Sequence, residues 1–275
     1  MAFCDTRLAQ QPGRRAIDMS FDIGSFSLTG KTALVIGGSS GIGRDIALGF
    51  RQAGAKVLIA ARGRDKLDRV SAELGAKADD RIAYSEDLRS VSALAALADS
   101  VAADHGALHI LVNCQGTTEI KPAIELTETE YDTILDTNLK SVFFACTAFG
   151  RGMMARGEGA IINISSLAAH TGWANAAAYC ASKWGVAGIT QSLAAEWGES
   201  GVRVNAIAPG FFMTELNQRR MSDERKAEAR RRSAMKRMGE LHELVGAAIF
   251  LASDAARFVT GSTLRVDGGY LSTGI

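Results

Sequence analysis

Several features that mark other classes of protein are missing from this sequence. No apolar run reaches the roughly 18 residues that a membrane-spanning helix requires. The formal net charge is only +1, so no overall field favours binding to nucleic acid. The four histidines are scattered and no Cys-x-x-Cys pair occurs, which argues against a metal site. The sequence therefore predicts no membrane partner, no nucleic-acid partner and no bound metal.

Cysteine is also scarce. Cys4, Cys114, Cys146 and Cys180 are widely separated along the chain. Spacing of this kind is typical of free thiols in a reducing compartment rather than of a disulfide framework. We therefore expect a cytoplasmic protein.

The length and composition favour one α/β domain. The chain has 275 residues, of which 47% are hydrophobic, and that is enough for a large buried core. Residues 1–27 differ from the rest, because they are polar, contain Pro12-Gly13-Arg14-Arg15 and lack the apolar centre of a signal peptide. We predict a poorly ordered tail over 1–27 and a single domain over 28–275.

Glycines cluster after the first strand-like run. Residues 32–37 are apolar and β-branched, Gly37-Gly38-Ser39-Ser40-Gly41-Ile42-Gly43 follow, and residues 44–53 have helical spacing. A strand, a glycine turn and a helix form the context in which a pyrophosphate binds at a helix N-terminus. The alternative is an ordinary turn whose glycines serve only packing.

A second cluster of residues favours proton transfer. Tyr179 and Lys183 are four residues apart and share one face of a predicted helix, and Ser166 precedes Tyr179 by thirteen residues. A lysine ammonium beside a phenol favours the phenolate, so we expect Lys183 to lower the pKa of Tyr179. Tyr179 would then exchange a proton with a substrate oxygen that Ser166 holds.

Strand-like runs recur with helical patterns between them. They lie near residues 32–37, 56–61, 81–85, 108–113, 160–165, 202–207 and 262–266. This alternation predicts a doubly wound (Rossmann) parallel sheet of seven strands with helices on both faces and ligands at the carboxyl ends of the strands. Gly37, Arg62, Asp87, Ser166 and Pro209 all fall at or just after such ends.

The glycine spacing Gly-x-x-x-Gly-x-Gly, together with Ser166, Tyr179 and Lys183, resembles the short-chain dehydrogenase/reductase family over about residues 28–270. Ile36 stands where the family usually has threonine, and Cys114-Gln115 interrupt the usual Asn-Asn-Ala-Gly. The resemblance implies that Asn138 completes a catalytic set with Ser166, Tyr179 and Lys183. The cofactor residues that it implies are Gly37, Ser39, Ser40, Gly41, Ile42, Gly43, Arg62, Asp87, Leu88, Asn113, Gly116, Tyr179, Lys183, Pro209, Gly210, Phe212 and Thr214.

The end of the second strand bears on cofactor choice. An acidic residue at position 61 would hold the ribose 2′-hydroxyl of NAD, but this chain has Ala61 followed by Arg62. A guanidinium binds a 2′-phosphate through charge-assisted hydrogen bonds, and Arg64 is close enough in sequence to assist. We therefore favour NADP(H) over NAD(H), against the alternative of a solvent-exposed arginine.

Residues 215–237 carry nine basic and four acidic residues. In the family that the sequence resembles, this segment is a mobile helical lid over the substrate. Two interpretations stay open, a solvated helix face and a basic lid that attracts an anionic substrate.

The resemblance is greatest to gluconate 5-dehydrogenase-like and 3-oxoacyl-[acyl-carrier-protein] reductase-like members. It implies an NADP(H)-dependent homotetramer that interconverts a carbonyl and a secondary alcohol, on a keto-sugar acid or else on a 3-oxoacyl thioester. A different class remains as a rival, namely a catalytically idle NADPH-sensing protein on the same fold.

Overall fold

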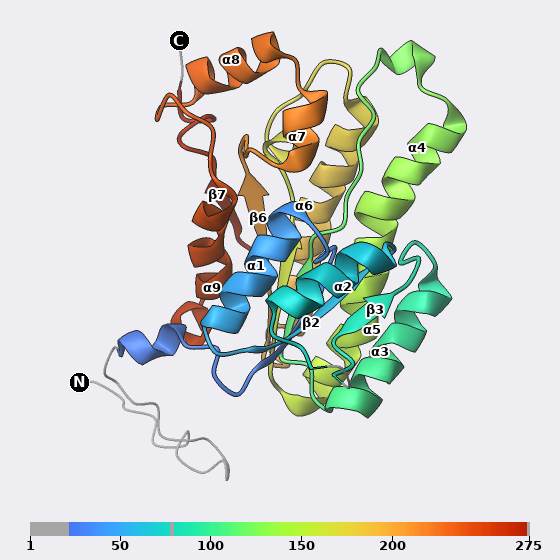
Figure 1. The fold of residues 1–275 in the computed structure, drawn as a ribbon, viewed down its shortest axis with the longest axis vertical. Helices are drawn as coiled ribbons and strands as arrows, with labels where there is room; N and C mark the ends of the chain where they lie inside the picture. Colours follow the sequence, from blue (N-terminus) through green and yellow to red (C-terminus); the bar gives the residue numbers. More distant parts are fainter. Residues whose placement is uncertain (1–21, 78–79, 274–275) are drawn as a thin grey trace, which may run out of the picture.

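Seven parallel strands form the centre of the molecule (Figure 1). The computed structural model describes residues 22–77 and 80–273. Across the sheet the strands follow the order β3-β2-β1-β4-β5-β6-β7. Their bounds are β1 Thr32–Ile36, β2 Lys56–Ala61, β3 Ala83–Ser85, β4 Ile110–Asn113, β5 Gly159–Ile164, β6 Val202–Pro209 and β7 Thr263–Val266. The predicted doubly wound sheet and its seven strands are confirmed.

The central strands are apolar throughout because both faces of the sheet are covered. Every residue of β1, β4 and β5 is buried. A strand buried on both faces reads as a continuous hydrophobic run rather than as an alternation, and the runs in the sequence had this character.

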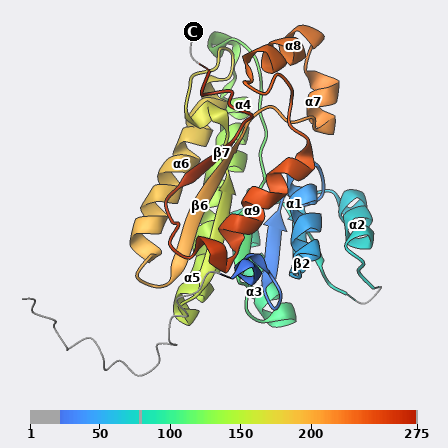
Figure 2. The same cartoon turned by 90° about the vertical axis from the view of Figure 1, so that its left-hand side faces the viewer.

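Helices lie on both faces of the sheet (Figure 2). α1, α2 and α9 cover one face, and α3, α5 and α6 cover the other. The helices are α1 Gly41–Gln52, α2 Arg64–Glu73, α3 Val91–His105, α4 Glu128–Leu135, α5 Ser141–Arg156, α6 Ala177–Trp197, α7 Glu215–Arg220, α8 Asp223–Arg232 and α9 Val245–Ala252. None of the helices within the described ranges is both long enough and apolar enough to cross a bilayer.

Strand β1 marks the point where the strand order reverses. It pairs with β2 on one side and with β4 on the other, both in parallel register. Loops that leave β1 and β4 therefore diverge to opposite faces and open a crevice at the carboxyl edge, where ligands bind in open α/β sheets.

The ordered domain begins before residue 28, and the predicted tail is too long. Asp22 accepts a hydrogen bond from the Gly24 amide and starts a short 3₁₀ helix, η2 (Ile23–Phe26). The Phe26 ring lies 6.2 Å from that of Phe250 on α9, so an apolar contact holds this turn to the domain. The remainder of the predicted tail, residues 1–21, lies outside the described residues.

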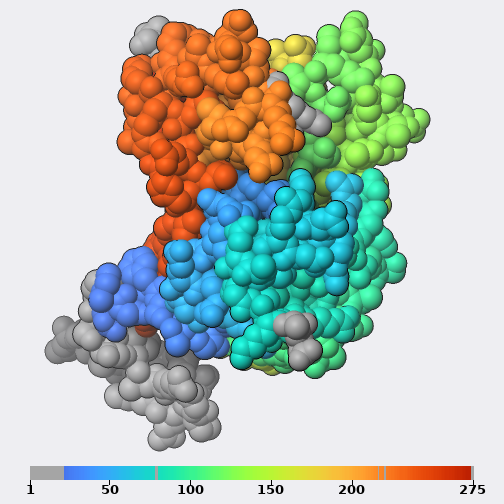
Figure 3. All heavy atoms as spheres, viewed as in Figure 1, coloured from blue at the N-terminus to red at the C-terminus, as the bar shows by residue number. Residues whose placement is uncertain are grey.

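Two helices form the predicted lid at the carboxyl edge. α7 and α8 are joined by a short turn, and Thr214 and Ser222 cap them by accepting hydrogen bonds from the amides of Asn217 and Arg225. In the space-filling view the orange lid lies above the blue segment that contains α1 (Figure 3). The lid segment thus borders the glycine turn that precedes α1.

Candidate active site

The glycine turn after β1 is shaped for a close ligand. Gly37 has φ +81°, and a Cβ there would lie 2.8 Å from the Cys114 carbonyl carbon. A Cβ on Gly43 would collide with the Gly37 carbonyl, so helix and turn pack backbone to backbone. Gly41, with φ +53°, has only the Thr214 methyl within 4 Å of its Cβ position. Two glycines are therefore needed for packing, and the third faces open space.

The N-terminus of α1 has free hydrogen-bond donors. Ser40 occupies the N-cap position, but its side chain makes no capping hydrogen bond. The first amides of a helix then remain available, and the helix dipole adds a partial positive charge at this end. With the open space over Gly41, this end suits an anionic group such as a pyrophosphate.

Four charged side chains lie at the adenosine end that the sequence predicts. Arg62 is exposed, follows β2 and makes no ion pair among the described residues, whereas Arg64 pairs with Asp68 at 3.3 Å. Asp87 follows β3, and Arg89 binds its carboxylate through Nε and Nη2, the shortest contact being 2.6 Å. Arg89 lowers the pKa of Asp87 to about 2, and Arg62 adds to the effect.

Asn113 is placed differently from the other predicted cofactor residues. Its side chain is fully buried, and its Nδ2 donates to the Asn163 Oδ1 at 2.9 Å and to the Cys146 Sγ at 3.3 Å. Asn163 in turn donates to Thr190 on α6 at 3.0 Å. Asn113 therefore links β4 to β5 and α5. It would influence cofactor binding only indirectly, by fixing the position of the loop that follows β4. Leu88 is buried too.

Ser166, Tyr179 and Lys183 meet at the carboxyl end of β5. Ser166 lies two residues beyond the strand and accepts a hydrogen bond from the Ala168 amide at 3.1 Å. Tyr179 and Lys183 occupy successive turns of α6. Ser166 is close enough to the Tyr179 phenol to oppose the rise in the phenol's pKa, which indicates that the two side chains face the same point.

The electrostatics of this group differ from the sequence-based expectation. Burial is the largest influence on Tyr179 and raises its pKa, and Ser166 rather than Lys183 opposes that shift. The Lys183 Nζ lies 5.9 Å from the centroid of the Tyr179 ring and donates to the Ile164 carbonyl at 2.8 Å. The prediction that Lys183 lowers the pKa of Tyr179 is wrong for this structure. Burial instead lowers the pKa of Lys183 itself, to about 8.

Asn138 lies in a π-helical turn, η4 (Asp136–Lys140), between α4 and α5. Such turns often occur at functional sites because they redirect one side chain. Its side chain accepts from the Thr117 amide at 2.7 Å and donates to the Thr117 carbonyl and to Ser182 Oγ. Ser182 neighbours Lys183, so Asn138 joins the loop after β4 to the catalytic helix. The sequence pointed to Asn138 but not to its partner Ser182.

An aromatic stack continues from Tyr179 toward the lid. The Trp173 ring lies 6.3 Å from that of Tyr179 and 5.5 Å from that of Phe211, nearly parallel to the latter at 11°. Phe211 also meets Tyr270 at 5.2 Å. Offset or tilted rings at these distances attract one another. The stack forms an apolar wall beside the Tyr179 ring.

The predicted residues from Pro209 to Thr214 lie at the end of β6 and in the loop that follows it. Pro209 ends the strand, and a Cβ on Gly210 would lie 2.7 Å from the Asp267 Cα, so the loop packs tightly on the segment after β7. Phe212 is buried, and its carbonyl accepts from Asn217 at 2.8 Å. Thr214 caps α7 and faces Gly41. The loop therefore connects the glycine turn to the lid.

A family model described as enoyl-(acyl carrier protein) reductase matches residues 36–271. The chain belongs to the short-chain dehydrogenase/reductase family. Its members are dehydrogenases and reductases that act on CH–OH groups, and this chain is an enzyme of that class. The expected family and fold are therefore confirmed.

Three relatives illustrate the range of substrates around this chain. D-threitol dehydrogenase from Mycolicibacterium smegmatis is 39% identical over 93% of this chain and 98% of its own length. A 3-oxoacyl-[acyl-carrier-protein] reductase from Staphylococcus aureus is 37% identical over 87% of this chain and 97% of its own. The structure of a gluconate 5-dehydrogenase from Burkholderia cenocepacia, in complex with NADP and tartrate, has 35% identity and a TM-score of 0.84 over 91% of this chain and 99% of that one.

Proposed function

We propose that this enzyme is an NADP(H)-dependent oxidoreductase for a small polyhydroxylated ketone and its secondary alcohol, with a keto-sugar acid as the first candidate. The observation that carries the proposal is the meeting of Ser166 and Tyr179 at the end of β5, beside the ring of Trp173. Polyol and sugar-acid dehydrogenases among the relatives support the substrate class.

The residues present fit a nicotinamide dinucleotide. The uncapped start of α1 and the open space over Gly41 suit its pyrophosphate, and the loop at Pro209–Phe212 would border its nicotinamide. When bound, the cofactor supplies or accepts a hydride at the substrate carbon. We infer a preference for NADP(H) because exposed Arg62 has no ion-pair partner among the described residues and a guanidinium binds a 2′-phosphate well.

Proton transfer then falls to the chain's own side chains. In reduction, Ser166 would donate a hydrogen bond to the carbonyl oxygen, and Tyr179 would protonate that oxygen as charge develops. The raised pKa of Tyr179 keeps the phenol protonated at neutral pH, as reduction requires. Lys183 would hold the ribose, and its position is fixed by the Ile164 carbonyl. In oxidation the same groups act in reverse.

The lid has fewer unpaired cations than its composition suggests. Lys226 pairs with Asp223, Arg231 with Glu228, and Arg237 with Glu243. Arg237 lines a cavity under the lid, but the Glu243 carboxylate binds it through both oxygens. A preference for an anionic substrate would therefore depend on exposed lid cations such as Arg219 and Arg230.

The deciding experiment is NADPH oxidation with 5-ketogluconate, the neutral ketose erythrulose and a 3-oxoacyl thioester. We expect turnover of the two polyhydroxylated ketones and little of the thioester. Preference for the thioester would assign the protein to the acyl-carrier-protein reductases. Tight NADPH binding without turnover of any carbonyl would favour the idle sensing protein.

We also propose a homotetramer. Phe143 on α5 and Trp184 on α6 are 38% and 54% exposed, which is unusual for large apolar side chains on two adjacent helices. Closed symmetric assembly is the common outcome for such surfaces. Light scattering should give four times the monomer mass, and a monomer at micromolar concentration would contradict the proposal.

A further inference from the structure

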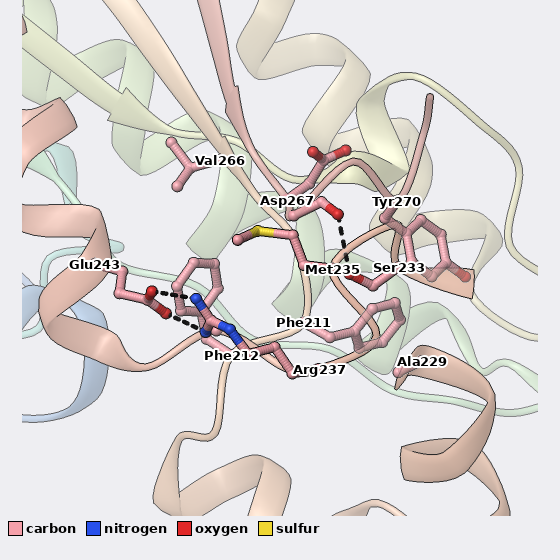
Figure 4. A pocket seen from close by; sticks show the side chains of 12 residues that line it. Phe211, Phe212, Ala229, Ser233, Met235, Arg237, Glu243, Val266, Asp267 and Tyr270 are labelled. Carbon is pink, nitrogen blue, oxygen red and sulfur yellow. Dashed lines mark hydrogen bonds and ion pairs between the residues drawn. The ribbon is translucent and has the colours of Figure 1, made fainter. Parts of the chain in front are cut away.

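A cavity lies next to α8, where Phe211 and Tyr270 of the aromatic stack are among its lining residues (Figure 4). It has a volume of about 230 Å³. Its walls are mainly apolar and include Phe211, Phe212, Met235, Val266 and Tyr270. Ser166, Trp173 and Tyr179 are not among the residues that line it. The cavity is therefore separate from the point where the reaction would occur.

Phe211 contacts both the aromatic stack and the cavity. Its ring stacks on Trp173 at 5.5 Å, next to Tyr179, and it also lines the cavity and contacts Tyr270 at 5.2 Å. The backbone of Phe211 is held as well, because its carbonyl accepts from the Gly239 amide at 2.9 Å. One side chain on a held backbone thus lies between the cavity and the Trp173 ring.

The far side of the cavity is closed by the lid and the turn after β7. The Arg232 guanidinium lies 4.9 Å from the Tyr270 ring centroid. Ser233 Oγ and the Met235 amide both donate to the Gly268 carbonyl, at 3.0 and 3.1 Å. These contacts join the lid to the turn after β7 on this side of the cavity.

We propose that the Phe211 side chain separates the substrate site from this cavity and thereby determines substrate specificity; we call this side chain the partition. When Phe211 is replaced by a smaller residue, the cavity accepts a compact apolar group such as a phenyl ring. An apolar cavity of roughly 150 Å³ is already large enough for benzene. The inference deepens the proposed function and rests on it, since the intact partition restricts the site to short, polar carbonyl compounds and excludes longer apolar chains.

A matched pair of substrates tests the partition. 2,3-Butanedione and 1-phenyl-1,2-propanedione carry the same reacting diketone, with a methyl group in one and a phenyl group in the other. Phe211→Ala should raise kcat/KM for the phenyl compound relative to the methyl compound by about tenfold or more. The reason is that each additional substrate carbon buried in an apolar pocket strengthens binding of the transition state. Phe211→Leu should give a smaller rise, and it serves if the alanine variant does not fold.

Two further variants test whether a change in the substrate ratio comes from the cavity or from a general loosening of the lid. Met221→Ala removes apolar volume from the lid cluster that packs near Phe211 but leaves the partition intact, so the substrate ratio should stay unchanged. Met235 is 60% exposed and lines the cavity, so Met235→Trp in the Phe211→Ala background should fill the cavity and cancel the gain.

Calorimetric titration with 1-phenyl-1,2-propanedione gives a readout that needs no turnover. The affinity should rise about tenfold in Phe211→Ala and return to the wild-type value with Met235→Trp. The proposal for Phe211 would be overturned if both Phe211 variants kept the wild-type phenyl-to-methyl ratio of kcat/KM and the wild-type affinity for the phenyl compound. An equal gain in Met221→Ala would also overturn it. Absence of turnover with a gain in affinity would instead overturn the proposed function and leave the partition standing.

Discussion

The catalytic group and the lid are held in place by different kinds of interaction. Ser166, Lys183 and Asn138 are buried and are fixed by hydrogen bonds to backbone groups of β5, of the short 3₁₀ helix η5 (Leu167–Ala169) and of the loop after β4. Helix α8 has one buried residue, Ala229, and its side-chain contacts are chiefly exposed ion pairs such as that of Arg231 with Glu228. Exposed pairs contribute little to stability. The predicted catalytic residues are therefore held by the core of the fold, whereas α8 is held mainly by contacts at the surface.

The largest expected effect comes from removing one oxygen atom of the catalytic group. Tyr179→Phe should lower turnover by at least roughly 10²–10⁴-fold, the contribution of a positioned acid–base group, and leave NADPH binding intact. The measurements are steady-state kinetics and fluorescence titration with NADPH. Tyr84→Phe is the control, because the Tyr84 hydroxyl also makes a hydrogen bond, to Asp104 at 3.1 Å, but lies on β3. Near-normal turnover in Tyr179→Phe would contradict the proposed role.

Substitution of Arg62 in the predicted cofactor site should have a smaller effect than Tyr179→Phe, and the effect should fall on NADPH rather than on NADH. Arg62→Asp replaces the partner expected for the 2′-phosphate by a repelling charge, so KM for NADPH should rise tenfold or more while NADH improves by comparison. Arg69→Asp makes the same charge change on α2, and it should leave the cofactor ratio unchanged. If the wild-type enzyme uses NADH better than NADPH, the proposed preference is wrong.

The buried charge of Lys183 should appear in the pH dependence of stability. Its pKa is about 8 in the folded protein, against 10.5 as the ordinary value, so between these pH values the unfolded chain holds a proton that the folded protein has released. This group alone makes stability rise with pH in this window, by up to about 3 kcal/mol. Lys183→Met should therefore make the slope of stability against pH less positive in urea unfolding between pH 8 and 10, whereas Lys56→Met, at an exposed lysine, should leave the slope unchanged. Equal slopes in all three proteins would contradict the assignment.

The lid should show the smallest effect. If exposed cations attract an anionic substrate, kcat/KM for 5-ketogluconate should fall roughly two- to fivefold from low to physiological ionic strength, since salt screens exposed charges. Arg219→Gln with Arg230→Gln should weaken that dependence, and Lys66→Gln on α2 should not. Equal salt dependence for the neutral erythrulose would mean that the lid charges only face solvent.

Most of the fold could be predicted from local patterns. The run at 56–61 became β2 with the same bounds, and the turn at Gly37–Gly43 leads into α1 because only glycine fits where backbone segments touch. The boundary at residue 27 was less accurate. The short helix η2 depends on a contact between Phe26 and Phe250, which are far apart in the sequence, so no local pattern reveals it.

The sequence by itself determined which groups the protein has for its chemistry and where along the chain they stand. Spacing brought Tyr179 and Lys183 to one helix face, and the end of β5 brought Ser166 to them. Only the tertiary structure decided their electrostatics, because a pKa depends on burial and on neighbours from other elements. It also decided the partition at Phe211, since that wall joins Trp173, Tyr270 and the lid, three segments that meet only when the sheet is complete.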